Sequence, residues 1–161
     1  MPKKQIKTTS IRLKLAVTFS LLFLVNGTSI SQLPKKALKL IGTWQHVHDQ
    51  GFETWRLEDN QLLGEAYRVT HLGDTVKIET MKLTYTAKTY QLLVTVFDQN
   101  DGRAIRFVSK KNRFMFENSN HDFPKAIVYK FSCWSRNKME AYLYHPHKDK
   151  LPHHIKFRKV N

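Results

Sequence analysis

The residues best suited to chemistry lie in one short stretch, F-E-N-S-N-H-D-F-P at positions 116–124. Its titratable members are Glu117, His121 and Asp122. A histidine beside a carboxylate forms a usable acid–base or metal-binding pair, because imidazole titrates near neutral pH. The same stretch also fits a turn, in which asparagine and aspartate side chains accept hydrogen bonds from nearby backbone N–H groups. Two hypotheses therefore remain open for it: a structural turn, and a group that contacts a ligand.

Three pairs of histidines raise the question of a metal or haem site. They are His46 with His48, His145 with His147, and His153 with His154. Two residues that are two positions apart on a strand share one face, so the first pair can reach one metal ion. Imidazole is also an axial ligand of haem iron. Because no H-x-x-x-H helix or carboxylate spacing accompanies these pairs, we predict no metal site and no cofactor, and keep haem or a transition metal as the alternative.

Motifs of known enzymes are missing from the sequence. It contains no G-x-S-x-G elbow, P-loop, Rossmann glycine pattern or zinc-protease motif. Cys133 has apolar neighbours in F-S-C-W, so we expect a small buried residue rather than a nucleophile. Glu53, Glu65 and Glu79 can enter a barrel among aromatic residues, where burial raises carboxylate pKa values. Interior carboxylates of binding barrels more often orient a ligand than catalyse a reaction, so we predict no catalytic residue and no enzyme.

The elements that position these residues are predicted to be strands. Beyond position 40, apolar and polar residues alternate with a period of two in short blocks bounded by turn residues. A helical turn or two is expected only at 34–40. Short strands with hairpin-length connections predict an all-β, up-and-down antiparallel barrel; a sandwich, the alternative, usually needs longer crossovers. The ten blocks cover 43–48, 52–58, 61–69, 75–85, 89–97, 103–109, 113–118, 125–131, 138–145 and 153–160.

The segment L-I-G-T-W at 40–44 predicts how the barrel begins. Gly42 allows the chain to bend at the barrel floor, and Trp44 supplies a large apolar body that closes this end. This opening is similar to the G-x-W opening of lipocalin-like (calycin) barrels. In those barrels a basic residue of the last strand lies over the tryptophan ring, so the resemblance implies a cation–π contact from Arg158.

The stretch 116–124, followed by Ile127 and Tyr129, resembles the signature F-E-N-P-x-H-D-F-P-x-x-I-x-Y. This signature belongs to a bacterial family of exported lipocalin-like barrels of unknown function, with more distant similarity to nitrobindin and fatty-acid-binding-protein barrels. The resemblance covers about 38–160 and implies the fold and export, but no activity. Ser119 replaces the usual proline, and Tyr144-His145 replaces a region where a glycine is expected. Further matching positions are 40–44, Glu53 with Trp55, Gly64 with Tyr67 and Val69, Asp74-Thr75, and Glu79.

Residues 1–31 read as a signal peptide. A basic start without acidic residues precedes an apolar run at 15–25 and small polar residues up to Ser31. This run is short of the roughly 20 residues that a membrane helix needs. We therefore predict cleavage before Gln32, a single barrel domain at 32–161, and export to the periplasm or the medium without integration into a membrane.

The chain is strongly basic, with 27 Lys and Arg against 13 Asp and Glu and a formal charge of +14. Such an excess favours contact with anionic surfaces, for example of the cell envelope. The basic residues are spread along the sequence rather than clustered on one element, so we predict no nucleic-acid partner.

Three functions fit these observations. The first is a barrel that binds a small apolar or amphipathic ligand, lined by Trp55, Tyr67 and Tyr129, with Glu79 for polarity and the 116–124 stretch at its mouth. The second is a haem- or metal-binding barrel similar to nitrobindin, which shares a similar L-I-G-T-W opening. The third is a structural envelope barrel without a ligand.

Overall fold

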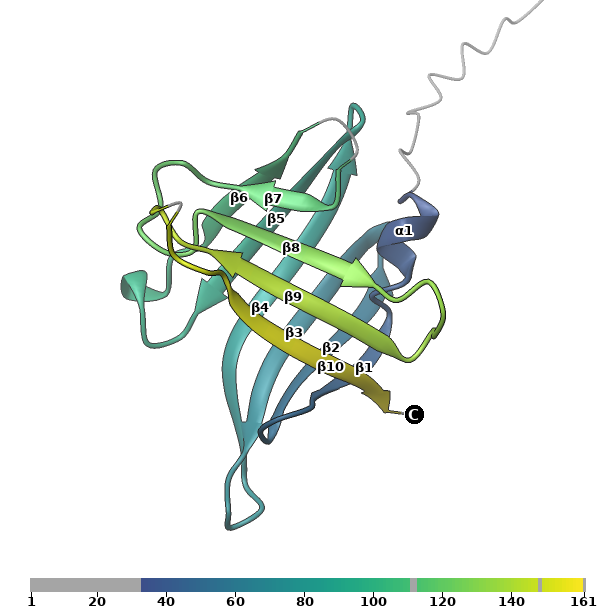
Figure 1. The fold of residues 1–161 in the computed structure, drawn as a ribbon, viewed down its shortest axis with the longest axis vertical. Coiled ribbons are helices and arrows are strands. Elements are labelled where there is room, and N and C mark those ends of the chain that lie inside the picture. The colour runs from purple at the N-terminus through teal and green to yellow at the C-terminus, as the bar shows by residue number, and fades with distance from the viewer. Residues whose placement is uncertain (1–32, 111–112, 148, 161) are drawn as a thin grey trace, which may run out of the picture.

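Ten antiparallel strands close into one barrel (Figure 1). The computed structural model describes residues 33–110, 113–147 and 149–160, so the predicted signal peptide lies outside the described residues. Each strand pairs with its neighbours in sequence, and β10 pairs with β1 to close the sheet, which confirms the predicted barrel. The strands are β1 (Gly42–His46), β2 (Gly51–Glu58), β3 (Gln61–Val69), β4 (Thr75–Thr86), β5 (Thr89–Val96), β6 (Ile105–Ser109), β7 (Met115–Glu117), β8 (Ala126–Phe131), β9 (Lys138–Tyr144) and β10 (His153–Val160).

The antiparallel order separates two ends of the barrel. The helix α1 (Lys35–Leu38) precedes β1 and lies near the tip of β8 in Figure 1, at the end we call the closed end. Loops that follow odd-numbered strands lie at the opposite end, which we call the open end. The open end includes the 3-10 helix η1 (Asn100–Gly102) and the loop at 118–125. In the part of the chain that the structure describes, no helix has the length and apolar character needed to cross a membrane.

Trp44 closes the end of the barrel that carries α1. Its side chain is 1% exposed, and its Nε1 donates a hydrogen bond of 2.6 Å to the carbonyl oxygen of Leu40. Gly42 precedes it with φ +121, a conformation that L-residues with side chains rarely adopt. The helix, the bend and the tryptophan together seal the apolar interior from water at this end.

The cation over the Trp44 ring is Lys159, not Arg158. The Lys159 Nζ lies 5.1 Å from the ring centroid and donates a hydrogen bond of 2.6 Å to the carbonyl oxygen of Ile41. The reason is strand alternation: Phe157 is buried inside the barrel, so Lys159 shares its face, whereas Arg158 points outward and is exposed. Gly42 makes room for this lysine, because a Cβ atom there would lie 2.5 Å from Lys159 Cε.

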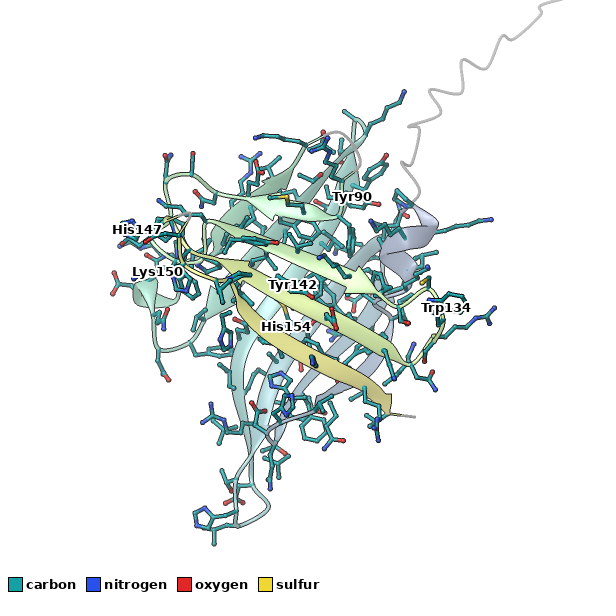
Figure 2. The ribbon with its side chains drawn as sticks, in the orientation of Figure 1. Tyr90, Trp134, Tyr142, His147, Lys150 and His154 are labelled. Carbon is teal, nitrogen blue, oxygen red and sulfur yellow. The ribbon has the colours of Figure 1, made fainter. Side chains whose placement is uncertain are left out.

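Cys133 is exposed, contrary to the expectation that it is buried. The strand β8 ends at Phe131, and F-S-C-W continues into a turn. In this turn the Ser132 Oγ accepts hydrogen bonds from the backbone N–H groups of Trp134 (3.2 Å) and Ser135 (3.1 Å). Figure 2 shows Trp134 at the β8–β9 loop, and its side chain is 95% exposed. Apolar neighbours in sequence therefore did not imply burial once the strand had ended.

Candidate functional site

A cavity of about 320 Å³ lies inside the barrel. Because successive residues of a strand point to opposite faces, its wall is built from alternate residues of several strands. Most of this wall is apolar, for example Met81, Val94, Phe107, Ile127 and Leu143. Gln99, His121, Phe123 and Pro124 also line it and come from loops of the open end, so we place the cavity mouth there.

Glu53 is the buried carboxylate of this cavity, with 6% of its surface exposed. Its Oε1 accepts a hydrogen bond of 2.5 Å from the Nε1 of Trp55, which is two residues away on the same face of β2. Burial raises the pKa of Glu53 to about 7; the hydrogen bonds from Trp55 and Tyr129 oppose this rise, and the charge of Glu79 adds to it. Glu53 therefore titrates closer to neutral pH than an ordinary carboxyl group does.

Gly64 fixes the position of the Trp55 ring. The two residues are directly paired across β2 and β3, and a Cβ atom at Gly64 would lie 2.9 Å from atoms of the indole. Because Gly64 has no side chain, the indole can lie against the β3 backbone. In this position the indole N–H donates its hydrogen bond to Glu53.

Glu79 adds a second carboxylate from β4. Ala66 on β3 pairs with both Glu53 and Glu79, so their Cα atoms are separated by about 10 Å, twice the spacing of neighbouring strands. Glu79 is half-buried, and burial raises its pKa. A register shift at this point of the β3–β4 pair brings both Ile78 and Glu79 into the cavity wall.

Tyr129 faces the two carboxylates from β8. Burial raises its pKa well above the ordinary value, and the charges of Glu53 and Glu79 raise it further, so the phenol keeps its proton. Its hydroxyl is 3.9 Å from the Met81 sulfur, and its ring meets Trp55 edge-on at 6.4 Å. The polar part of the cavity wall thus contains two acids and a phenol, and the indole N–H of Trp55 supports Glu53 from beside the cavity.

Three of the predicted site residues line this cavity: Glu79, His121 and Tyr129. Trp55 lies beside it as the hydrogen-bond donor to Glu53. Tyr67, which we expected in the wall, lies on the outer face instead. It is directly paired with Phe52, and the two rings stack at 5.2 Å. Tyr67 follows the inward-facing Ala66 by one residue, so strand alternation turns its side chain outward.

Glu117 and Asp122 lie outside the cavity wall. Phe116 is fully buried, so the next residue of β7 points outward, where the Glu117 Oε2 lies 2.7 Å from the Lys110 Nζ. Asp122 is exposed in the loop that follows β7. Of the predicted His–carboxylate pair, only the histidine reaches the interior.

Asn118 holds the loop that carries His121. Its Oδ1 accepts hydrogen bonds from the backbone N–H groups of Asn120 (2.9 Å) and His121 (3.1 Å). The His121 Nδ1 lies 3.1 Å from the carbonyl oxygen of Pro124, and its ring meets Phe107 edge-on at 5.7 Å. The turn and the cavity wall therefore share this histidine, and both hypotheses for the stretch have structural support.

The paired histidines do not converge on one site: His46 is half-buried, with its ring edge-on to the buried Phe157, whereas His147, His153 and His154 are exposed. The strand β1 ends at His46, so alternation no longer places His48 on the same face, and the His46 Nδ1 lies 2.8 Å from the Asp49 carboxylate. His154 stacks on Tyr142 at 4.4 Å, and both are labelled in Figure 2. Within residues 33–110, 113–147 and 149–160, no group of three or more His, Cys, Asp or Glu side chains is arranged to hold a metal ion.

Glu53 lines the cavity although the sequence pattern did not predict it as a site residue. The sequence pattern allows Glu53 to enter the barrel, as it allows Glu65 and Glu79, but does not distinguish it as a site residue. The available signal was the E-x-W spacing on β2 opposite Gly64, which predicts an acid and an indole on one face. Glu65, the third acid, points outward and lies 3.2 Å from the Lys77 Nζ.

No family model, curated protein or solved structure matches this chain.

Proposed function

We propose that the protein is an exported β-barrel that binds a small apolar or amphipathic molecule in its cavity. The observation that carries this proposal is the cavity of about 320 Å³, with a mostly apolar wall and a few polar groups that converge on it. Small-molecule sites commonly have this size and composition, because apolar contact supplies affinity while a few polar groups fix orientation. A purely structural barrel gains nothing from an unfilled interior, since empty space sacrifices packing.

The direct test uses the neutral fluorescent probe N-phenyl-1-naphthylamine. Binding inside the barrel should increase and blue-shift its emission in a saturable way. Val94→Trp, which places a large side chain in the cavity wall, should abolish this signal. Thr95→Trp puts the same side chain on the outer face of the same strand and should bind as the wild type does. The proposal would be contradicted if the wild type showed no saturable binding, or if Val94→Trp bound the probe as well as Thr95→Trp does. Circular dichroism checks that both variants are folded.

Native mass spectrometry of freshly purified protein complements this test by detecting any ligand that copurifies. An absorbance spectrum of the same sample checks for haem, the alternative that the resemblance to nitrobindin raised. We expect a small organic ligand and no Soret band.

Export is the second part of the proposal. It is supported by the basic start and the short apolar run at 15–25. N-terminal sequencing of protein from the envelope or medium of the producing cells should give a chain that begins near Gln32. Recovery of the intact Met1 start would contradict export by cleavage.

A further inference from the structure

The charge of the cavity is opposite to the charge of the protein. The chain carries a formal charge of +14, yet none of the lysines and arginines at 33–110, 113–147 and 149–160 lines the cavity. The acidic groups in its wall are Glu53 and Glu79, and its remaining polar side chains are Gln99, His121 and Tyr129.

Neither acid has a cationic partner in the part of the chain that the structure describes. The ion pairs found there involve other carboxylates, such as Glu65 with Lys77 and Glu117 with Lys110. Glu53 instead receives neutral donors, the indole of Trp55 and the phenol of Tyr129. A buried carboxylate is costly unless an opposite charge compensates for it. This interior therefore offers a place for a cation that the described chain does not supply.

We propose that the cavity takes an amphipathic amine, with its ammonium group beside Glu53 and Glu79 and its apolar body against the rest of the wall. This inference rests on the proposed function and specifies the class of ligand. An ammonium carries three N–H donors and no acceptor, and it brings the positive charge that the neutral donors of Trp55 and Tyr129 do not supply to Glu53. The ring of Tyr129 in the cavity wall adds a surface on which a cation is favoured.

The same groups disfavour the opposite type of ligand. A fatty acid or another anionic amphiphile would place its carboxylate beside two acids, and no lysine or arginine of the described residues lies in the wall to neutralise it. Like-charge contact in a poorly solvated site is strongly unfavourable. A neutral alcohol is intermediate, because it can donate one hydrogen bond but compensates no charge.

Isothermal titration calorimetry with three ligands of equal chain length separates these cases. Octylammonium, octan-1-ol and octanoate are titrated into the wild-type protein at pH 8, where the amine is still largely protonated and both acids are more fully ionised than at neutral pH. We expect octylammonium to bind about tenfold or more tightly than octan-1-ol, and octanoate to bind most weakly. Equal affinities for the three, or a preference for octanoate, would overturn the inference.

Charge-removing variants locate the effect. Glu53→Gln and Glu79→Gln should each lower the affinity for octylammonium by about tenfold. The affinity of each variant for octan-1-ol should stay within about twofold of the wild-type value. Glu65→Gln is the matched control: it removes an equivalent charge from the outer face of β3 and should leave both affinities nearly unchanged. An equal loss of amine affinity in all three variants would indicate an effect of overall charge and would contradict a site at Glu53 and Glu79.

Failure of this inference is distinguishable from failure of the proposed function. If N-phenyl-1-naphthylamine binds in the cavity but octylammonium is not preferred, the barrel binds ligands and the amine class is wrong. If neither the neutral probe nor any of the three ligands binds, the proposed function itself fails and the inference falls with it.

Discussion

Glu53 is held in an environment that opposes its ionisation. It is almost fully buried, and burial raises its pKa to about 7, mainly because the charged form loses hydration. In the unfolded chain the same carboxyl has an ordinary pKa near 4.5. The folded protein therefore binds this proton more tightly than the unfolded chain does. The stability that results is fully present below about pH 4.5 and is lost as the pH rises through 7.

The first prediction follows from this difference. Relative to Glu53→Gln, the wild-type free energy of unfolding should fall by about 3 kcal/mol between pH 4.5 and pH 8. Urea unfolding of both proteins at several pH values measures the effect, and the comparison cancels the titration of groups that the two proteins share. Parallel pH profiles would show that Glu53 has an ordinary pKa and would contradict its burial as a carboxyl group.

Lys159 gives a second prediction for a single residue. Lys159→Met removes the cation above Trp44 and leaves the carbonyl oxygen of Ile41 without its donor, so it should cost about 1–2 kcal/mol of stability. Arg158→Met, the adjacent exposed position, should cost less than about 0.5 kcal/mol. Trp44→Ala should cost about 3–5 kcal/mol, as large aromatic truncations in cores do. Equal unfolding midpoints for the Lys159 and Arg158 variants would contradict the role given to Lys159.

At the scale of elements, the loop at 118–125 depends on Asn118. Its side-chain oxygen accepts two backbone N–H groups and so sets the turn that places His121 in the cavity wall. Asn118→Ala should therefore cost about 1–2 kcal/mol, as loss of these acceptors does in other turns. Asn120→Ala is the control, since this exposed residue contributes its backbone N–H to the turn. Differences in urea midpoint measure both effects, and a larger loss for the Asn120 variant would refute this description of the turn.

The strands themselves were predictable from the sequence, and their faces less so. Period-two alternation located all ten strands, because each has one side in an apolar interior. Successive side chains of a strand lie on opposite faces of the sheet, so an error of one position moves a side chain from the inner face of the barrel to the outer face. Such an error explains why the sequence predicted Arg158, rather than Lys159, over the Trp44 ring. It also explains why Tyr67 was expected in the cavity wall although it lies on the outer face. The register shift that brings both Ile78 and Glu79 inward arises from pairing between strands, which a single-strand pattern does not contain.

At the scale of the whole molecule, closure of the barrel creates the candidate site. Glu53, Glu79 and Tyr129 come from β2, β4 and β8, and only the closed sheet brings the last of them opposite the first two. The sequence predicted the barrel, its closed end and a cavity contribution from His121. It did not predict that the two acids share a wall to which no described lysine or arginine contributes, because that feature depends on how all the strands are arranged around the cavity. The result is a basic exterior around an acidic interior.

A ligand enclosed by the whole barrel should also stabilise the whole barrel. The unfolded chain has no cavity, so a ligand at a hundred times its dissociation constant should add about 2.7 kcal/mol to the free energy of unfolding. For a domain of this size that corresponds to a rise in Tm on the order of 10 °C. Differential scanning calorimetry with saturating N-phenyl-1-naphthylamine measures the shift in the wild type, in Thr95→Trp and in Val94→Trp. We expect the full shift in the first two proteins and almost none in the third, whose cavity is filled. A shift of equal size in all three would place the probe on the surface and would rule out the interior of the barrel as its binding site.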